Sequence, residues 1–248
     1  MALPIIAFYN IKGGVGKTAA VVNLAFLASR EGNLVLLCDL DPQGAASFYL
    51  RIRPTKKYRA RHLITSKGKV AKNIKGTDFE HLDVLPAVLS YRNLDILLGG
   101  IKHSKNQLQE VLHHLQNEYR YIFLDCPPNI TLVSENVFVA ANLLLVPVIP
   151  TTLSMLSYQK LSNFFEKHDY ETAKLIGFFS MVETRKKLHR QIISQSSDSH
   201  LRFLQNQIPY SAEVERMGLS RRPVVEYRPH AMASLAYERL WQEVKAIL

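Results

Sequence analysis

The residues that could do chemistry begin in a glycine-rich segment near the N-terminus. Residues 10–18 read NIKGGVGKT and separate an apolar run from an amphipathic one. Glycines let the backbone curl so that successive N–H groups cradle phosphate oxygens, and a helix beginning near Lys17 points its positive end at the same group. Lys17 can reach the outer phosphates, and the Thr18 hydroxyl can ligate Mg²⁺. The segment therefore predicts a site for ATP with magnesium.

Three carboxylates follow apolar runs that have the character of buried strands. Asp39 and Asp41 lie in CDLDPQG (38–44), and Asp125 lies in YIFLDCPP (121–128). Carboxyl ends of parallel strands meet at one edge of a sheet, where ligands bind in open α/β proteins. Phosphoryl transfer needs acceptors that hold Mg²⁺ and orient water. A turn rich in Asp, Pro and Gly would by itself indicate only a turn. Because both motifs follow the glycine-rich segment along the chain, they support its interpretation as a phosphate-binding loop.

The phosphate-binding loop departs from the standard G-x-x-x-x-G-K-T, because Ile11 takes the first glycine position and Lys12 is an additional lysine. In this respect the chain resembles the ParA/MinD family of ATPases, whose deviant loop reads K-G-G-x-G-K-T. The resemblance extends to D-x-D-P-Q-G and D-C-P-P. It implies that Lys12 crosses an ATP-dependent dimer interface to the partner's nucleotide, that Asp41 positions the attacking water, and that Asp39 and Asp125 serve the magnesium ion.

The resemblance covers nearly the whole chain, including LDVLPA (82–87), LVPV (145–148) and IPY (208–210). It departs from the family pattern at Ala19, Asn142 and Tyr210, none of which is an expected catalytic group. The expected catalytic residues are Lys12, Lys17 and Asp41, and the expected metal ligands are Thr18, Asp39 and Asp125. The expected nucleotide-binding residues are Lys12, Gly13, Gly14, Val15, Gly16, Lys17, Thr18 and, beside the adenine, Pro209.

Apolar runs alternate with amphipathic stretches along the 248 residues, which predicts one α/β domain over residues 1–248. Its mostly parallel, twisted sheet should be flanked by helices in the fold of P-loop NTPases. Strands are predicted at residues 4–9, 34–38, 82–85, 121–124, 143–148, 175–179 and, more weakly, 203–208. Helices are predicted at residues 17–30, 105–118, 130–141, 153–166 and 231–247.

The net charge of +10 favours a polyanionic partner. The segment from Arg51 to Lys75 contains ten Lys or Arg residues and no Asp or Glu, which predicts a solvated, mobile surface segment and a second candidate for DNA contact. By resemblance, non-specific DNA would bind to the C-terminal third. The candidate contacts there are Arg185, Lys186, Lys187, Arg190, Arg216, Arg221 and Arg222.

The resemblance to the ParA branch implies an ATP-bound homodimer that binds DNA and partitions or positions DNA or another cargo. A separate ParB-like or cargo-adaptor protein would stimulate its slow hydrolysis. The N-terminal run, residues 1–6, has no basic region before it, and no apolar stretch approaches the length of a membrane span. We therefore expect a cytoplasmic, nucleoid-associated protein.

Two alternatives remain open at this stage. A MinD-like membrane-associated ATPase would need a membrane-binding helix, but residues 237–248 have the pattern of the last domain helix, with no appended anchor. A metabolic ligase would need a second substrate site, and no carboxylate or cysteine cluster is left to form one. Cys38 and Cys126 lie far apart and outside any CxxC pair, which argues against a zinc site or a disulfide framework.

Overall fold

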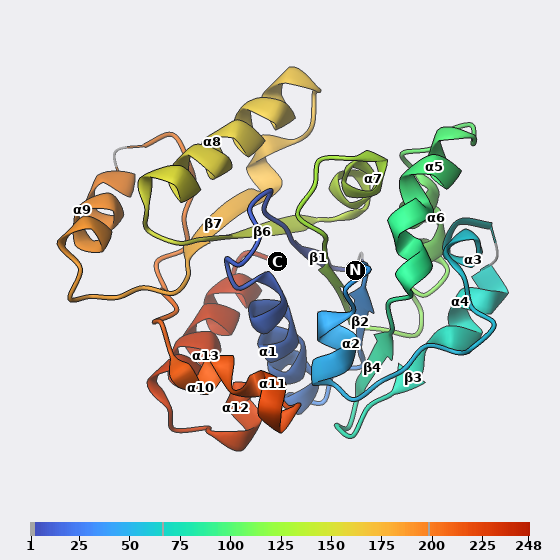
Figure 1. Cartoon of the computed structure of the whole chain (residues 1–248), viewed down its shortest axis with the longest axis horizontal. Coiled ribbons are helices and arrows are strands. Elements are labelled where there is room, and N and C mark those ends of the chain that lie inside the picture. The colour runs from blue at the N-terminus through green and yellow to red at the C-terminus, as the bar shows by residue number, and fades with distance from the viewer. Residues whose placement is uncertain (1–2, 66, 198) are drawn as a thin grey trace.

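Strands and helices alternate through most of the chain (Figure 1). The computed structural model describes residues 3–65, 67–197 and 199–248, so Met1, Ala2, Ser66 and Asp198 lie outside the described residues. The strands are β1 (Ile5–Phe8), β2 (Val35–Asp39), β3 (Lys75–Gly76), β4 (Leu82–Leu85), β5 (Tyr121–Asp125), β6 (Leu143–Val148) and β7 (Leu175–Phe179).

The α-helices differ widely in length. The longest are α1 (Lys17–Arg30), α8 (Thr152–Lys167) and α13 (Met232–Lys245). The others are α2 (Ala45–Tyr49), α3 (Ala60–Thr65), α4 (Lys67–Asn73), α5 (Leu94–Gly99), α6 (Gln107–His113), α7 (Leu132–Ala140), α9 (Lys187–Ser196), α10 (Ala212–Glu215), α11 (Met217–Ser220) and α12 (Val224–Tyr227). Short 3₁₀ helices span Leu89–Asn93 and Thr172–Lys174.

The strands form one seven-stranded sheet with the order β3-β4-β2-β5-β1-β6-β7. Every neighbouring pair is parallel except β3 and β4. β1 lies between β5 and β6, with Ile6 in register with Phe123 on one side and Leu143 on the other. The carboxyl ends of β1, β2 and β5 consequently share one edge of the sheet, and the loops that follow them are neighbours.

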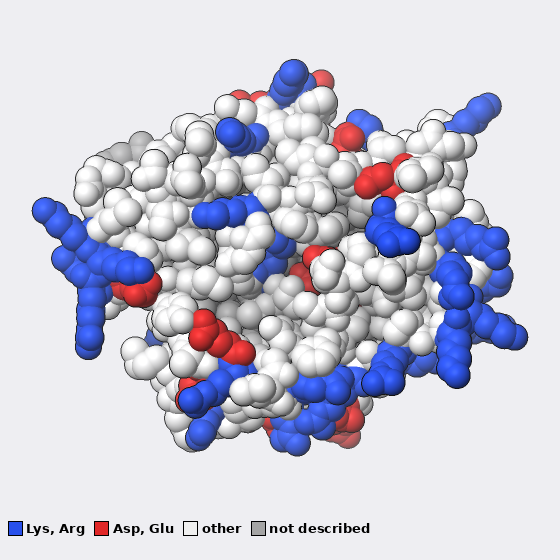
Figure 2. Space-filling view, in the orientation of Figure 1, with Lys and Arg blue, Asp and Glu red and all other residues white. Residues whose placement is uncertain are grey.

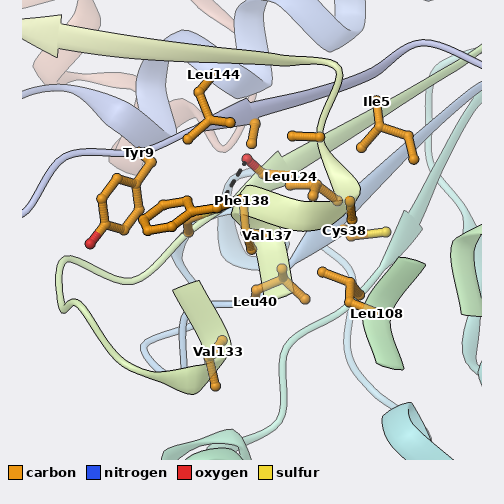
Figure 3. Close-up of a cluster of buried hydrophobic side chains, with 14 of the residues drawn as sticks. Ile5, Tyr9, Cys38, Leu40, Leu108, Leu124, Val133, Val137, Phe138 and Leu144 are labelled. Atoms are coloured by element: carbon orange, nitrogen blue, oxygen red, sulfur yellow. Dashed lines mark hydrogen bonds between the residues drawn. The ribbon is translucent and has the colours of Figure 1, made fainter. Parts of the chain in front are cut away.

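Helices cover both faces of the sheet, because its central strands are apolar on both sides. On one face lie α1 and α13, and Trp241 of α13 packs on Tyr121 and Phe123 with ring centroids 5.4 and 5.9 Å apart. On the other face lie α7 and α8 (Figure 1). Phe138 of α7 contacts Tyr9 edge-on at 4.9 Å, at the centre of the cluster in Figure 3.

The structure confirms most of the predicted elements. β4, β6, β7 and α1 have the predicted bounds, and α6, α7, α8 and α13 are present with shifted ends. The strand predicted at residues 203–208 is wrong. The backbone N–H groups of Gln205 and Asn206 donate to the Glu243 carboxylate of α13, at 2.6 and 3.0 Å, instead of to a neighbouring strand. The segment joins β7 at its two ends, where Phe203 bridges to Gly177 and the Ile208 N–H donates to the Phe179 carbonyl at 2.8 Å.

The basic segment also differs from its prediction. It contains α3 and α4, and its few apolar side chains are buried: Tyr58, Leu63 and Val70 are each less than 5% exposed. These side chains join the core cluster on the α7 face of the sheet. Most of the described lysines and arginines of the segment are exposed, so the segment is a folded layer with a basic outer surface. Across the described ranges, no helix has the length and apolarity that a bilayer crossing requires.

Candidate functional site

The glycine-rich loop is anchored at its start by Asn10, which is buried directly after β1. The Asn10 side chain donates from Nδ2 to the Pro147 carbonyl of β6 at 2.9 Å. Its Oδ1 accepts the Lys12 backbone N–H at 2.8 Å. The amide thus fixes the first residues of the loop against the neighbouring strand.

The glycines of the loop allow it to turn into α1. Gly14 and Gly16 have φ values of +71° and +89°, a conformation that L side chains rarely adopt. Gly16 caps α1, and a Cβ atom there would lie 2.9 Å from the Ser180 hydroxyl oxygen. The first turn of α1, beginning at Lys17, carries no acidic side chain. The N–H groups and the positive end of this helix are therefore directed at the loop, as an anion site requires.

The two lysines of the loop occupy different positions. Lys17 is only 8% exposed and donates from Nζ to the Lys12 carbonyl at 3.3 Å, across the loop. Burial lowers the pKa of Lys17, and the nearby carboxylates of Asp125 and Asp41 oppose this shift. Lys12 is half-buried, and its Nζ donates to the Ser154 hydroxyl in the first turn of α8 at 3.0 Å. The ammonium group of Lys12 is thus directed away from the loop toward α8, whereas that of Lys17 lies across the loop.

Asp39 and Asp125 lie side by side at the ends of β2 and β5. They are in register with one another, and both are fully buried. Asp39 accepts from the Ser47 N–H and hydroxyl through Oδ2, at 2.8 and 2.6 Å. Its other oxygen and both oxygens of Asp125 have no hydrogen-bond partner among the described residues. Two buried carboxylates therefore face one another with most of their oxygens unpaired.

The burial of this pair changes its acidity. Burial raises the pKa of Asp39 from 3.8 to about 6, against two hydrogen bonds from Ser47. Burial and the Asp39 charge raise the pKa of Asp125 well above 3.8, although Thr18 and Lys17 oppose the shift. Such a pair needs a cation or protons to be stable. Mg²⁺ fits this donor set: it prefers oxygen ligands and takes one or two carboxylates, completing its shell with water and substrate phosphates.

Asp41 lies in the turn after β2, half-buried. Its carboxylate accepts the Gln43 N–H at 2.9 Å, and its carbonyl accepts the Gly44 N–H at 2.9 Å. The turn is joined to β5, because the Leu40 N–H donates to the Asp125 carbonyl at 2.9 Å. Asp41 also lines a groove of about 380 Å³, together with residues that follow β5. It can accept a hydrogen bond from a water molecule in this groove.

Pro209 lies in the loop that runs beside the end of β7. Val182 bridges to Pro209, the Val182 N–H donates to the Ile208 carbonyl at 2.9 Å, and the Tyr210 N–H returns to Val182 at 3.0 Å. Residues 180–181 of the same β7 extension border the loop at Gly16. The segment with Pro209 is therefore attached to the structure that flanks the phosphate loop, on its β7 side.

The predicted DNA-contact residues fall into two groups. Arg185, Lys186, Lys187 and Arg190 surround the start of α9, at the left edge of the basic surface in Figure 2. The second group lies around α11, elsewhere on the molecule, and consists of Arg216, Arg221 and Arg222.

The group around α11 is already engaged with protein atoms. Arg216 and Arg222 pair with Glu213 and Glu226 at 3.6 and 3.4 Å. Arg221 donates to the Phe48 carbonyl at 2.9 Å. The structure thus brings the α9 group together but does not join it to the α11 group.

Several residues of the site carry no recognisable sequence signal. Ser47, Ser154 and Ser180 contact Asp39, Lys12 and Gly16 respectively, but serine is common and these contacts depend on the tertiary fold. Asn10 is the exception. A polar residue between a buried strand and a phosphate loop could have been identified as a loop anchor.

The seven-stranded sheet and the loop–helix unit at β1, with buried aspartates ending β2 and β5, define the fold of P-loop nucleoside triphosphatases. The sequence model of the AAA domain matches residues 3–176, more than half of the chain. The sporulation initiation inhibitor protein Soj of Bacillus subtilis is 29% identical over 248 residues and 98% of both chains. The chain belongs to the ParA/MinD family of P-loop ATPases.

Solved structures support the same fold. The McdA–ATP complex of Cyanothece superposes with a TM-score of 0.85 at 19% identity, covering 98% of this chain and 97% of that one. The cell division ATPase MinD of Pyrococcus furiosus gives a TM-score of 0.80 at 20% identity, covering 99% of both chains. At this identity the likeness concerns the fold alone.

Proposed function

We propose that this protein is an ATP-dependent dimerising switch, which binds non-specific DNA and hydrolyses ATP slowly to partition or position DNA or another cargo. The observation that carries the proposal is the convergence of Lys17, Thr18 and the buried Asp39–Asp125 pair at one edge of the sheet. A cation and a triphosphate would compensate the charges that the protein alone leaves unpaired.

In this proposal each residue has a defined role. The backbone N–H groups of residues 13–18 and Lys17 bind the phosphates. Thr18 would ligate Mg²⁺, Asp125 would hold it through water, and Asp39 would lie in its shell. Asp41, which lines the groove between the residues that follow β2 and β5, would orient the attacking water. When bound, Mg²⁺ neutralises charge on the phosphate oxygens, and Pro209 borders the adenine.

The second lysine supports dimerisation. Lys12 is half-buried and is held by a neutral hydroxyl, Ser154, and not by a carboxylate. It is therefore free to exchange this hydrogen bond for a stronger, charge-assisted one to a phosphate. A partner's nucleotide would supply that phosphate, and two such lysines would offset the charge of two triphosphates in a face-to-face dimer.

DNA binding is supported by the charge of the molecule and by the basic group at α9. Lys186 pairs with Glu183 there, while Arg190 donates to the Thr184 and Arg185 carbonyls, which fixes the loop before the helix. Phosphate contacts need only such cations and carry no sequence information. A separate ParB-like or cargo-adaptor protein would trigger hydrolysis and release the DNA within the cytoplasm.

The membrane-associated alternative is less well supported. Tyr237, Leu240 and Trp241 of α13 are at most 2% exposed and pack against the sheet, whereas Met232 and Leu235 of the same helix are exposed. The face of this helix that carries its aromatic side chains is therefore part of the core and is not available to bind a lipid surface.

The experiment that tests the proposal is binding to a random-sequence duplex with ATP, with ADP and without nucleotide, at several salt concentrations. The wild type is expected to bind only with ATP, with an affinity that falls as salt increases. Lys12→Ala should lose this binding. Lys102→Ala, which removes an exposed lysine elsewhere, is the matched control and should retain it. Binding that is independent of nucleotide would contradict the proposal.

A further inference from the structure

The basic segment encloses a pocket that plays no part in the proposed ATP site. Its volume is about 260 Å³, and it lies between α3, α4 and the turn before them, at the right edge of the molecule in Figure 1. None of its described lining residues belongs to the phosphate loop or to the loops after β2 and β5. The lining residues are Thr55, Lys57, Tyr58, His62, Lys69, Lys72 and Asn73.

The rim of the pocket is strongly positive. Lys57, Lys69 and Lys72 are exposed, and none forms an ion pair with any residue that the structure describes. The segment from Arg51 to Lys75 contains no acidic residue that could neutralise them. Figure 2 shows basic side chains gathered over α3 and α4 at this edge. The pocket therefore opens into a region of uncompensated positive charge.

Beneath this rim lies a buried hydrogen-bond donor without an acceptor. Asn73 is 1% exposed, and its Oδ1 accepts the Thr55 N–H at 2.9 Å, which fixes the orientation of the amide. Its Nδ2 has no hydrogen-bond partner among the described residues. A buried donor left in this state destabilises the fold. Asn73 lines the pocket, so a ligand with acceptor oxygens could satisfy it.

His62 and Lys69 present a second mismatch. The Arg59 backbone N–H donates to His62 Nδ1 at 3.0 Å, so the proton of the neutral ring is on Nε2. Lys69 Nζ lies 3.4 Å from this nitrogen. Burial, Lys69 and the adjacent arginines lower the pKa of His62, which keeps the ring neutral at pH 7. A neutral ring with an Nε2–H group and an ammonium group are both donors, and they point at one another without an acceptor between them.

We propose that this pocket binds the phosphate group of a small molecule. Its oxygens would accept from Asn73 Nδ2 and His62 Nε2, and its charge would be met by Lys57, Lys69 and Lys72. A phosphate group supplies several acceptor oxygens and up to two negative charges, which matches the donor groups of Asn73 and His62 and the positive charges of the three lysines. Asn73 lies below the surface, where a compact anion can reach it more readily than the backbone of a duplex.

The test is a titration of pyrophosphate into the 248-residue protein. Binding is measured by calorimetry and by the NMR signals of the Asn73 side-chain amide and the His62 ring. Because the phosphate loop would also bind this probe, the titration is made in wild type and in Lys17→Ala. Lys69→Gln is the pocket variant. Lys56→Gln removes the same charge from the same segment but from outside the pocket lining, and serves as the matched control. The Lys17→Ala variant keeps the pocket side chains Asn73, His62 and Lys69 and the control side chain Lys56.

We expect pyrophosphate binding that survives Lys17→Ala, shifts the Asn73 and His62 signals, and weakens about tenfold in Lys69→Gln but less than twofold in Lys56→Gln. Because Lys69 is exposed, its substitution should leave the fold intact, and unchanged thermal melting will check this. Equal weakening in both glutamine variants would overturn the proposal, as would the absence of binding in Lys17→Ala. Signals that shift with a short DNA duplex but not with pyrophosphate would assign the pocket to a nucleic-acid surface and also overturn it.

Discussion

Removing one charge from the buried carboxylate pair should stabilise the protein while impairing its activity. Asp39→Asn keeps an oxygen that can accept the two hydrogen bonds from Ser47, but it removes the negative charge that faces Asp125. Its nitrogen would replace an oxygen that has no partner among the described residues. The substitution is therefore expected to remove the cost of burying this charge, together with its repulsion of Asp125, without leaving a cavity.

The magnitude follows from the acidity of Asp39. Its pKa is about 6 in the folded protein against 3.8 ordinarily, which corresponds to a cost of about 3 kcal/mol for the ionised form at neutral pH. The folded state holds the Asp39 proton more tightly than the unfolded state does. The free energy of unfolding therefore falls by this amount as the pH rises from about 4 to above 6. Asp39→Asn should regain about 2–3 kcal/mol at pH 7.5 and about half of that at pH 5.

The assay is thermal unfolding of the nucleotide-free and magnesium-free protein at both pH values. For a chain of this length, the expected gain at pH 7.5 is about 5–10 °C in Tm. Asp78→Asn, which changes an exposed aspartate paired with Arg51, is the control and should shift Tm only slightly. An Asp39→Asn variant with an unchanged or lower Tm at pH 7.5 would refute the reasoning, because it would show that the pair is already compensated by the protein.

Three further substitutions have defined outcomes. Gly177→Ala would place a Cβ atom 2.7 Å from the Tyr158 ring. It should therefore lower the free energy of unfolding, measured by chemical denaturation, by about 1–3 kcal/mol. Unchanged stability would show that the ring moves freely. Gly16→Ala combines a φ of +89° with a 2.9 Å approach to Ser180, and should weaken binding of a fluorescent ATP analogue on the order of tenfold. Lys17→Ala should abolish that binding, and retained affinity would disprove the assignment of the loop.

The sequence predicted the central sheet and the phosphate loop well, because both depend on local patterns. Continuous apolar runs gave β6 and β7 their bounds, and the glycine–lysine spacing at residues 12–18 identified the loop before α1. The order of the carboxylates also indicated that Asp39 and Asp125 would meet, since both end parallel strands. The sequence could not show that Asp39 and Asp125 are in register or that three of their carboxylate oxygens have no hydrogen-bond partner among the described residues.

The errors arose where tertiary contacts outweigh local pattern. Residues 203–208 read FLQNQI, with apolar residues at both ends that suggested a strand, but Glu243 of the C-terminal helix accepts the backbone N–H groups of the polar residues between them, Gln205 and Asn206. The basic segment has few apolar residues, yet Tyr58 and Val70 are sufficient to attach it to the core. The contact between Lys12 and Ser154 joins residues 142 positions apart, and no local rule could have predicted it.

The measurement that tests the central claim most directly is sedimentation velocity of Asp41→Ala with ATP and Mg²⁺. Asp41 is proposed to orient the attacking water and not to bind the nucleotide, so this variant should accumulate as an ATP-bound dimer. Adding Lys12→Ala should return it to a monomer, because the lysine that crosses to the partner's nucleotide is lost. An Asp41→Ala protein that remains monomeric at saturating ATP, or that hydrolyses ATP at the wild-type rate, would contradict the account.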